Sequence, residues 1–206
     1  MSVITSHIRI ADFKLWKDGT VVFAFDESRD TGKFLKAAYK FLGMKYMKFF
    51  KMDSLSKLGL LGAEMLLQDK DIHAKYTEEE IGVVLANASA SLDVDRKYYD
   101  TIKDPENYFP SPALFVYTLP NIVLGEISIR HGFKGENAFF VQQNFDAGFM
   151  HFYNEDLLTR KSQKALISGW VEVGENGFEA RMYLIEQNGA GMKHLPENIK
   201  SLFLTK

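Results

Sequence analysis

One stretch of the sequence is apolar without interruption and has the length of a single strand. From Ile81 to Ala86 the chain carries Ile, Gly, Val, Val, Leu and Ala, with acidic residues before the run and small polar residues after it. A run of this length without alternation is typical of a central parallel strand that is buried on both faces. Such a strand requires a sheet with helices on both sides.

The other segments supply the remaining strands and helices of such a fold. Alternating apolar and polar residues predict strands, and apolar residues at helical spacing predict helices. A length of 206 residues fits one domain. We therefore expect an α/β fold, a mixed β-sheet covered by helices, in a single domain over residues 1–206. Strands are expected at 3–10, 19–25, 138–141, 164–173 and 178–186, with a turn at 174–177, and helices at 33–42, 54–67, 92–102 and 145–160, with two helical pieces between 112 and 130 that meet at 119–121.

A second constraining feature is a strand that runs directly into a helix. Ala138 to Val141 is predicted to be a short buried strand, and a helix is expected from Phe145. A side chain at such a turn lies over the positive end of the helix, where a thiolate is stabilised and reactive. Here the turn carries Gln143 and Asn144, and the chain contains no cysteine. Because an amide forms no acyl-enzyme, the turn provides a nucleophile position without a nucleophile.

Four short motifs carry a resemblance to a known family. They resemble, in order and spacing, the N-terminal half of the β-ketoacyl-acyl-carrier-protein synthases of the thiolase-like superfamily, most strongly over residues 48–173. The resemblance implies a single thiolase-like half, in which the second half of the family's fold is missing. The motifs are an aromatic-Lys-x-Asp-x-Leu-Ser-Lys segment from Phe50 to Lys57, Ser111-Pro112-Ala113, Thr118-Leu119-Pro120-Asn121 and Gly135-Glu136-Asn137.

The resemblance also implies where the catalytic cysteine of such enzymes would stand. In the family it follows the Asn of the last motif by seven residues, which is Asn144 here. A shift by one residue places Gln143 there instead, and Gln at this site is similar to the chain-length-factor subunits that pair with true ketosynthases. The two His and the Lys that drive decarboxylation in the family belong to its second half, and none of the five histidines here lies in a matching motif. No catalytic residue is therefore assigned.

Three functions follow from the resemblance. The first is a non-catalytic, chain-length-factor-like subunit that acts with a true ketosynthase and an acyl carrier protein in fatty-acid or polyene-type biosynthesis. The second is an acyltransferase or decarboxylase that needs a partner chain for its histidines. The third is a stand-alone homodimer that binds an acyl chain. In thiolase-like proteins the strand equivalent to 138–141 pairs across a two-fold axis, so we expect a homodimer or a heterodimer with a full-length ketosynthase.

Aromatic residues gather around the turn. Packing in a plain core is the default reading of such a group, whereas the resemblance implies an acyl pocket or a dimer seam. His151, about two helical turns after Asn144, is also a candidate for lining that pocket, although a single His on an aromatic helix is more often a packing residue. The aromatic candidates are Phe139, Phe140, Phe145 and Phe149.

Composition and charge exclude several classes of function. With 46% hydrophobic and 25% charged residues the chain has the composition of a globular protein. Its formal net charge of -2, with basic residues spread along the chain, offers no concentrated field for nucleic acid. No apolar run approaches the ~20 residues that span a bilayer, and no signal peptide is apparent, so a cytoplasmic location is expected.

The histidines suggest no metal site. No two His or carboxylates stand at metal-ligand spacing, so neither a metal nor another cofactor is expected. His131 is expected to end a helix as a cation that favours the C-terminal dipole, and His194 to lie at the surface.

Overall fold

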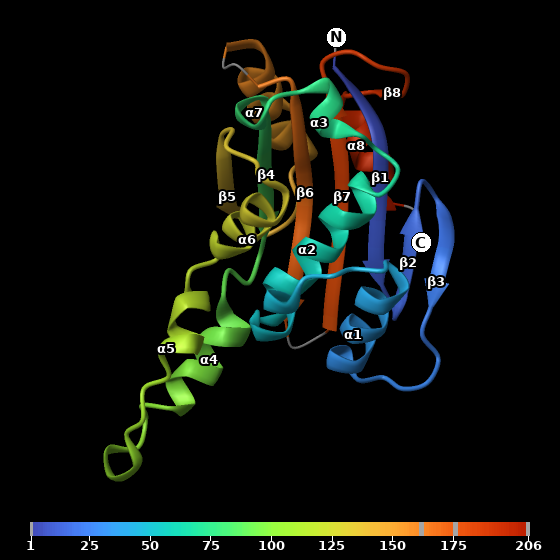
Figure 1. Cartoon of the computed structure of the whole chain (residues 1–206). Coiled ribbons are helices and arrows are strands. Elements are labelled where there is room, and N and C mark those ends of the chain that lie inside the picture. Colours follow the sequence, from blue (N-terminus) through green and yellow to red (C-terminus); the bar gives the residue numbers. More distant parts are fainter. Residues whose placement is uncertain (1, 161–162, 175–176, 205–206) are drawn as a thin grey trace.

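A computed structural model describes residues 2–160, 163–174 and 177–204 (Figure 1). Over these residues the chain forms an eight-stranded sheet and two layers of helices. The strands are β1 (Val3–Ala11), β2 (Lys14–Lys17), β3 (Thr20–Ala24), β4 (Ile81–Asn87), β5 (Asn137–Val141), β6 (Ala165–Gly174), β7 (Gly177–Glu186) and β8 (Met192–Lys193). The helices are α1 (Thr31–Phe41), α2 (Ser54–Leu67), α3 (Ile72–Lys75), α4 (Leu92–Asp100), α5 (Pro112–Phe115), α6 (Ile122–His131), α7 (Ala147–Arg160) and α8 (Pro196–Leu204), with 3₁₀ turns at Met47–Lys51, Glu78–Glu80, Pro105–Asn107 and Val116–Thr118.

The sheet is mixed, as predicted. Its order is β3-β2-β1-β7-β6-β4-β5, and β8 adds to β1. β4 lies between β5 and β6 and is parallel to both, whereas the pairs from β6 through β7 and β1 to β2 and β3 are antiparallel. All seven residues of β4 are buried, which confirms the prediction from its uninterrupted apolar run.

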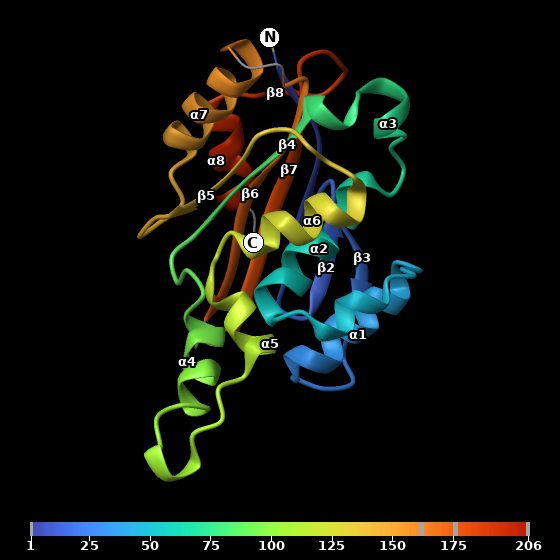
Figure 2. The ribbon, with the colours of Figure 1, turned by 60° about the vertical axis from the view of Figure 1, so that its left-hand side comes forward.

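Helices cover both faces of the sheet. Figures 1 and 2 show α1, α2 and α6 on one face and α7 and α8 on the other. The first face holds the larger core, and the second holds a smaller one that includes Met150 of α7 and Ile199 of α8. Side chains of β4 reach both cores, since Val83 and Leu85 belong to the first, and Val84 and Ala86 to the second. Because successive side chains of β4 point into opposite cores, helices must cover both faces of the sheet.

The long helix α2 is buried on nearly every side. Asp53 caps it by accepting hydrogen bonds from the backbone N–H groups of Leu55 and Ser56. The helix lies between the sheet and α6, and Glu64 and Lys57 interrupt an otherwise buried surface. Gly59 allows this close packing, since a Cβ there would overlap the buried side chain of Val123 in α6.

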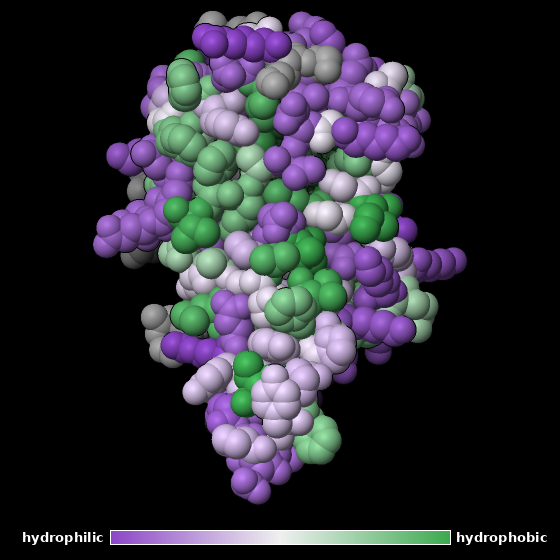
Figure 3. Space-filling model, turned by 90° about the vertical axis from the view of Figure 1, so that its left-hand side faces the viewer, coloured by the Kyte–Doolittle hydropathy of each residue, from purple (hydrophilic) through white to green (hydrophobic). Residues whose placement is uncertain are grey.

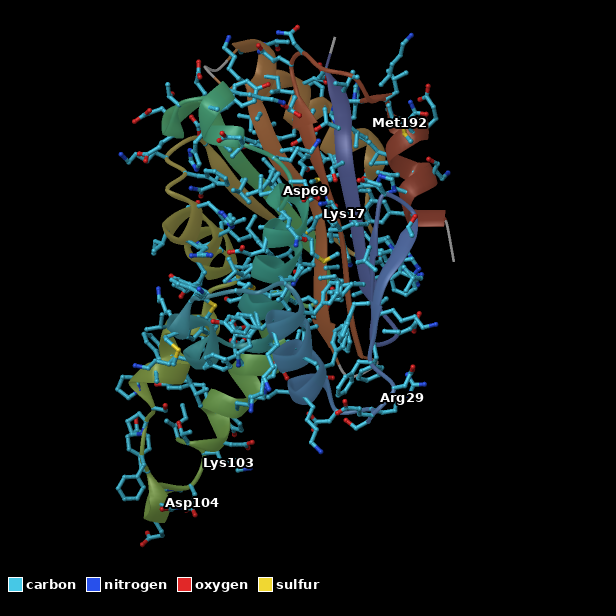
Figure 4. All side chains as sticks on the ribbon, turned by 45° about the vertical axis from the view of Figure 1, so that its right-hand side comes forward. Lys17, Arg29, Asp69, Lys103, Asp104 and Met192 are labelled. Atoms are coloured by element: carbon cyan, nitrogen blue, oxygen red, sulfur yellow. The ribbon has the colours of Figure 1, made fainter. Side chains whose placement is uncertain are left out.

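An arm projects from one end of the sheet. α4, the turn at Pro105–Asn107 and α5 form it (Figures 1 and 2), and Lys103 and Asp104 lie near its far end (Figure 4). The two predicted helical pieces meet here, with a bend of 99° between Pro112–Thr118 and Ile122–His131. Of the described helices, none is by itself long and apolar enough to cross a membrane, and this bent pair meets the criterion by length and composition only.

Several local predictions were incomplete or wrong. β2 was not predicted, and it forms a hairpin with β3. An ion pair connects this hairpin to the residues after α2, with 2.6 Å between the Nζ of Lys17 and the Oδ2 of Asp69 (Figure 4). β5 is an edge strand and only half-buried, where a buried strand was expected. The predicted turn at 174–177 includes two residues outside the described ranges, and the C-terminal segment, for which no helix was predicted, forms the nine-residue α8.

His131 ends α6, as predicted, but it is not a cation. Gly132 follows it in the left-handed conformation and closes the helix. Burial lowers the pKa of His131 from 6.5 to about 4, against the attraction of Glu64, whose carboxylate lies 3.7 Å from the ring Nε2. The ring also stacks on Phe133. The loss of hydration therefore outweighs the helix dipole and the nearby carboxylate.

The contact between α2 and α6 predicts the effect of adding one methyl group. Gly59→Ala should lower the free energy of unfolding by about 1–2 kcal/mol, because overpacking exceeds the gain in helix propensity. Gly125→Ala in α6 is the control: a Cβ there meets nothing within 4 Å, so stability should stay equal or rise. Urea denaturation measures both, and equal stabilities for the two variants would contradict the close packing of α2.

The pKa of His131 predicts a pH dependence. The unfolded chain takes up a proton near pH 6.5 and the folded chain only near pH 4, so stability is lost as the pH falls through this window. The loss from this ring is roughly 3 kcal/mol. In His131→Gln this part of the profile should be absent. A variant profile that runs parallel to the wild type from pH 6.5 to 4 would show that His131 is not buried in its neutral form.

Candidate functional site

The turn between β5 and α7 carries the predicted nucleophile position. Gln143 and Asn144 lie in this turn, and both are exposed. The helix begins at Ala147, two residues later than predicted. Asn144 therefore stands before the helix and is not its first residue.

Asp146 occupies the positive end of α7. Its carboxylate Oδ1 accepts a hydrogen bond of 2.9 Å from the backbone N–H of Phe149, and its carbonyl accepts one of 3.0 Å from Met150. This is the geometry of an N-cap, and a carboxylate there is favoured by the helix dipole. The sequence analysis missed this residue, although an Asp just before a helical segment is a known start signal. A negative charge at this end opposes the formation of a thiolate or an oxyanion nearby.

An open hollow of about 910 Å³ lies beside the turn, between α7 and α8. The ring of Phe145 stacks on Phe203 of α8, with 3.7 Å between the ring centres and 11° between the planes. Among the residues that the structure describes, carboxylates, amides and the cation of Lys200 surround this apolar floor, and no histidine lines the hollow. Its lining residues are Gln142, Gln143, Asn144, Phe145, Asp146, Ala147, Gly148, Pro196, Glu197, Lys200 and Phe203.

The structure does not bring all the aromatic candidates together. Phe139 packs against the core on the α2 side of the sheet, whereas Phe140, Phe145 and Phe149 pack on the α7 side. Phe140 meets the rings of Phe149 and Tyr153 edge to face, at 4.8 and 4.9 Å between centres. Only Phe145 of the four lines the hollow. The other three form the inner surfaces of the edge strand and of α7.

His151 lies apart from the hollow, in a cluster that the sequence analysis did not anticipate. Its ring centre is 5.0 Å from that of His194, which is 1% exposed and not at the surface as expected. Glu155, one turn after His151, has its Oε1 2.7 Å from the Nδ1 of His194 and accepts a hydrogen bond from the hydroxyl of Ser2. The i,i+4 spacing of His151 and Glu155 was the available signal, but the sequence could not place His194 beside them.

The pKa values of His194 and Glu155 are both shifted downward in this cluster. Burial lowers the pKa of His194, and Glu155 opposes that shift. Burial raises the pKa of Glu155, but the hydrogen bonds from His194 and Ser2 outweigh it, so the net shift is downward. The ring is therefore held neutral or shares its proton with an ionised carboxylate near neutral pH.

The outer edge of β5 is apolar and lies open to solvent. Over the described residues β5 pairs only with β4. Val141 on this strand is 57% exposed, Ile129 on the neighbouring α6 is 67% exposed and Phe152 on α7 is 68% exposed. Figure 3 views this side of the molecule and shows hydrophobic side chains gathered in its middle. We call β5 with Ile129 and Phe152 the edge surface.

The arm also exposes large apolar side chains. Ten of the sixteen large hydrophobic residues found exposed in the described chain belong to residues 92–152, which include the arm and the edge surface. Exposed apolar residues that are scattered singly are normal in a protein surface. Their concentration in one part of the chain is instead typical of a contact with another protein. Those on the arm and its end are Leu92, Tyr99, Tyr108, Phe109, Phe115, Val116 and Leu119.

Comparison by sequence identifies no relative. No model of a known protein family matches the chain, and no curated protein matches it.

Comparison of folds gives a consistent result. The ishigamide ketosynthase/chain length factor matches with a TM-score of 0.64 and 18% identity, over 92% of this chain and 63% of that chain. A structure of the ketosynthase ApeO in complex with its chain length factor ApeC, from Xenorhabdus doucetiae, matches with a TM-score of 0.62 and 14% identity, over 98% and 90%. A β-ketoacyl synthase from Burkholderia phymatum matches with a TM-score of 0.62 and 12% identity, over 99% and 61%.

These matches show the fold. The chain has the α/β fold of one thiolase-like half, as the sequence motifs led us to expect. It spans less than two thirds of the matched chain in the first and third structures, and nine tenths of the matched chain in the second. At identities of 12–18% the matches carry no assignment of activity.

The two polar residues of the turn predict different effects on stability. Asn144→Ala should leave the free energy of unfolding within about 0.5 kcal/mol of the wild type, because the residue is exposed. Asp146→Ala should cost about 1 kcal/mol, because it removes the cap of α7. Urea denaturation compares the two variants. A larger loss for Asn144→Ala than for Asp146→Ala would mean that Asn144 supports the helix.

Proposed function

We propose that this chain is a non-catalytic, chain-length-factor-like subunit that pairs with a ketosynthase. The observation that carries the proposal is the turn between β5 and α7, where a condensing enzyme needs a thiol. This turn holds the amides of Gln143 and Asn144, and the carboxylate of Asp146 caps the helix behind them. An amide is not a nucleophile, and the carboxylate disfavours further negative charge.

The surroundings of the turn add no catalytic group. Decarboxylation of a malonyl unit and acyl transfer both develop negative charge, which a cation or hydrogen-bond donors must stabilise. The hollow beside the turn offers Lys200 for this, but Asp146 and Glu197 line it as well. The described residues that line it include no histidine to act as a base. A condensing activity would thus have to come from another chain.

The edge surface supports pairing through β5. An apolar edge strand with unpaired backbone groups is a site of aggregation unless a second strand covers it. A ketosynthase that presents its own equivalent strand would form one continuous sheet with β5 and would bury Val141, with Ile129 and Phe152 on either side. ApeO in complex with its chain length factor ApeC is a complex of a ketosynthase with such a subunit, and this chain covers 90% of the matched chain.

The inner aromatic residues suit a role in limiting an acyl chain. Phe139 and Phe140 are half-buried on opposite faces of the edge strand, so each would lie close to the partner. In a pocket that crosses such an interface, their volume would set how far an acyl chain extends. An acyl carrier protein would deliver that chain to the ketosynthase, in fatty-acid or polyene-type biosynthesis.

Two other functions make different predictions. An acyltransferase or decarboxylase that borrows histidines from a partner would lose turnover in Asn144→Ala. A stand-alone homodimer would bind a free acyl chain without another protein, and the apolar floor of Phe145 and Phe203 in the hollow is the observation that favours it. Tight binding of a fatty acid by the isolated chain, lost in Phe203→Ala, would support that function over ours.

The role of the edge surface is tested by a charge on each edge of the sheet. Val141→Glu places a carboxylate on β5, whereas Val21→Glu places one on β3 at the opposite edge, where the residue is 48% exposed. The chain is co-expressed with a complete ketosynthase, and the affinity of the purified proteins is measured. Val141→Glu should weaken the complex by at least ~30-fold, or about 2 kcal/mol, because an unpaired charge enters an apolar contact.

The control and the partner's activity complete this test. Val21→Glu should leave the affinity unchanged, and both variants should unfold at the temperature of the wild type, since both positions are exposed in the isolated chain. Condensing activity of the complex should survive Asn144→Ala and should fall with Val141→Glu. Equal affinities for the two glutamate variants would exclude β5 as the contact.

A further inference from the structure

Three potential metal ligands meet on the α7 side of the sheet. His151 and Glu155 lie one turn apart on α7, and His194 lies between β8 and α8. Each offers one donor atom, and the three atoms lie within 4.8 Å of one another. We propose that His151, Glu155 and His194 bind a divalent transition-metal ion, for which Zn²⁺ is the best chemical fit. This site is separate from the edge surface and does not depend on the proposed partner.

Hydrogen bonding leaves two ring nitrogens of the cluster unsatisfied. Glu155 and the hydroxyl of Ser2 account for the Nδ1 of His194. The Nε2 of His194 and the Nδ1 of His151 are both buried and have no hydrogen-bond partner among the described residues. The side chain of His194 is fully buried. A buried nitrogen without a partner is unfavourable, and a metal ion that accepts the lone pair of the His151 ring removes that cost.

A simple ion pair does not explain the whole cluster. The contact between Glu155 and His194 would be complete without a third residue. His151 contributes a second ring, whose centre lies 5.0 Å from that of His194. Two imidazoles that face one carboxylate repel each other as cations but bind one metal together as neutral ligands.

The donor set selects the class of metal. Two imidazole nitrogens and one carboxylate oxygen suit Zn²⁺ and neighbouring transition metals, whereas Mg²⁺ and Ca²⁺ prefer oxygen ligands alone. The i,i+4 spacing places His151 and Glu155 on one face of the helix. Three protein ligands leave one position for water. Ser2, which donates a hydrogen bond to Glu155, would orient that ligand from outside the metal's own shell.

The position of the site suggests what the metal does. His194 directly precedes α8, whose Ile199 is buried in the second core and whose Phe203 covers Phe145. A metal that joins His194 to α7 would fix α8 over the hollow beside the turn. The ion is therefore expected to be structural and to raise the stability of the folded chain by binding the folded state alone.

The test uses the full, untagged chain after treatment with a chelator. Zn²⁺ is titrated by calorimetry and by competition with a coloured indicator. We expect one equivalent to bind, with an increase in Tm of about 5 °C when free Zn²⁺ exceeds Kd by 100-fold. Co²⁺ should bind at the same site and give visible absorption bands, and Mg²⁺ should not compete.

Variants decide whether these three residues hold the ion. His151→Ala and Glu155→Gln should each weaken Zn²⁺ binding by at least 100-fold and abolish the rise in Tm. His73→Ala, which changes an exposed histidine on α3, should bind as the wild type does. Circular dichroism of the metal-free proteins establishes that each variant is folded, and Glu155→Gln carries the test should His151→Ala not fold. Substoichiometric binding by the wild type, or binding that both ligand variants retain, would overturn the proposal.

Discussion

The burial of β4 on both faces is the constraint on which the rest of the structure depends. Parallel neighbours on both sides and hydrophobic side chains on both faces leave no surface of this strand for water. Two helical layers must therefore cover the sheet, and the chain after β5 must pass to the α7 side. The parallel pairing of β4 and β5 also places the end of β5, the turn and the start of α7 at one edge of the sheet.

The groups that the chain presents at that place support the proposal that it is not itself a condensing enzyme. A strand-to-helix turn can hold a nucleophile over a positive helix end, but here Asp146 already neutralises that end. Exposed apolar side chains lie instead on β5, on α6 and on the arm. A subunit that acts by shaping its partner's binding site needs such an exposed surface and does not need a nucleophile.

The sequence predicted the parts of the fold that local patterns determine. The apolar run of β4, the capped helix α2 and the hairpin of β6 and β7 all have strong local signals. The turn between β1 and β2 was not predicted, because its residues Asp12 and Phe13 adopt positive φ without a glycine to indicate a turn. The burial of α2 on all sides, and of His194, depends on contacts between distant segments. Asp146 carried a local signal, and its importance became clear only from the observed start of α7.

Hydrogen exchange of the backbone amides tests directly whether a ketosynthase covers β5, as we propose. Exchange of residues 137–141 is compared between the isolated chain and its complex, with β3 at the other edge as an internal reference. We predict that exchange in β5 slows by at least tenfold in the complex while β3 is unchanged. Equal exchange of β5 in the free and bound chain would contradict the claim.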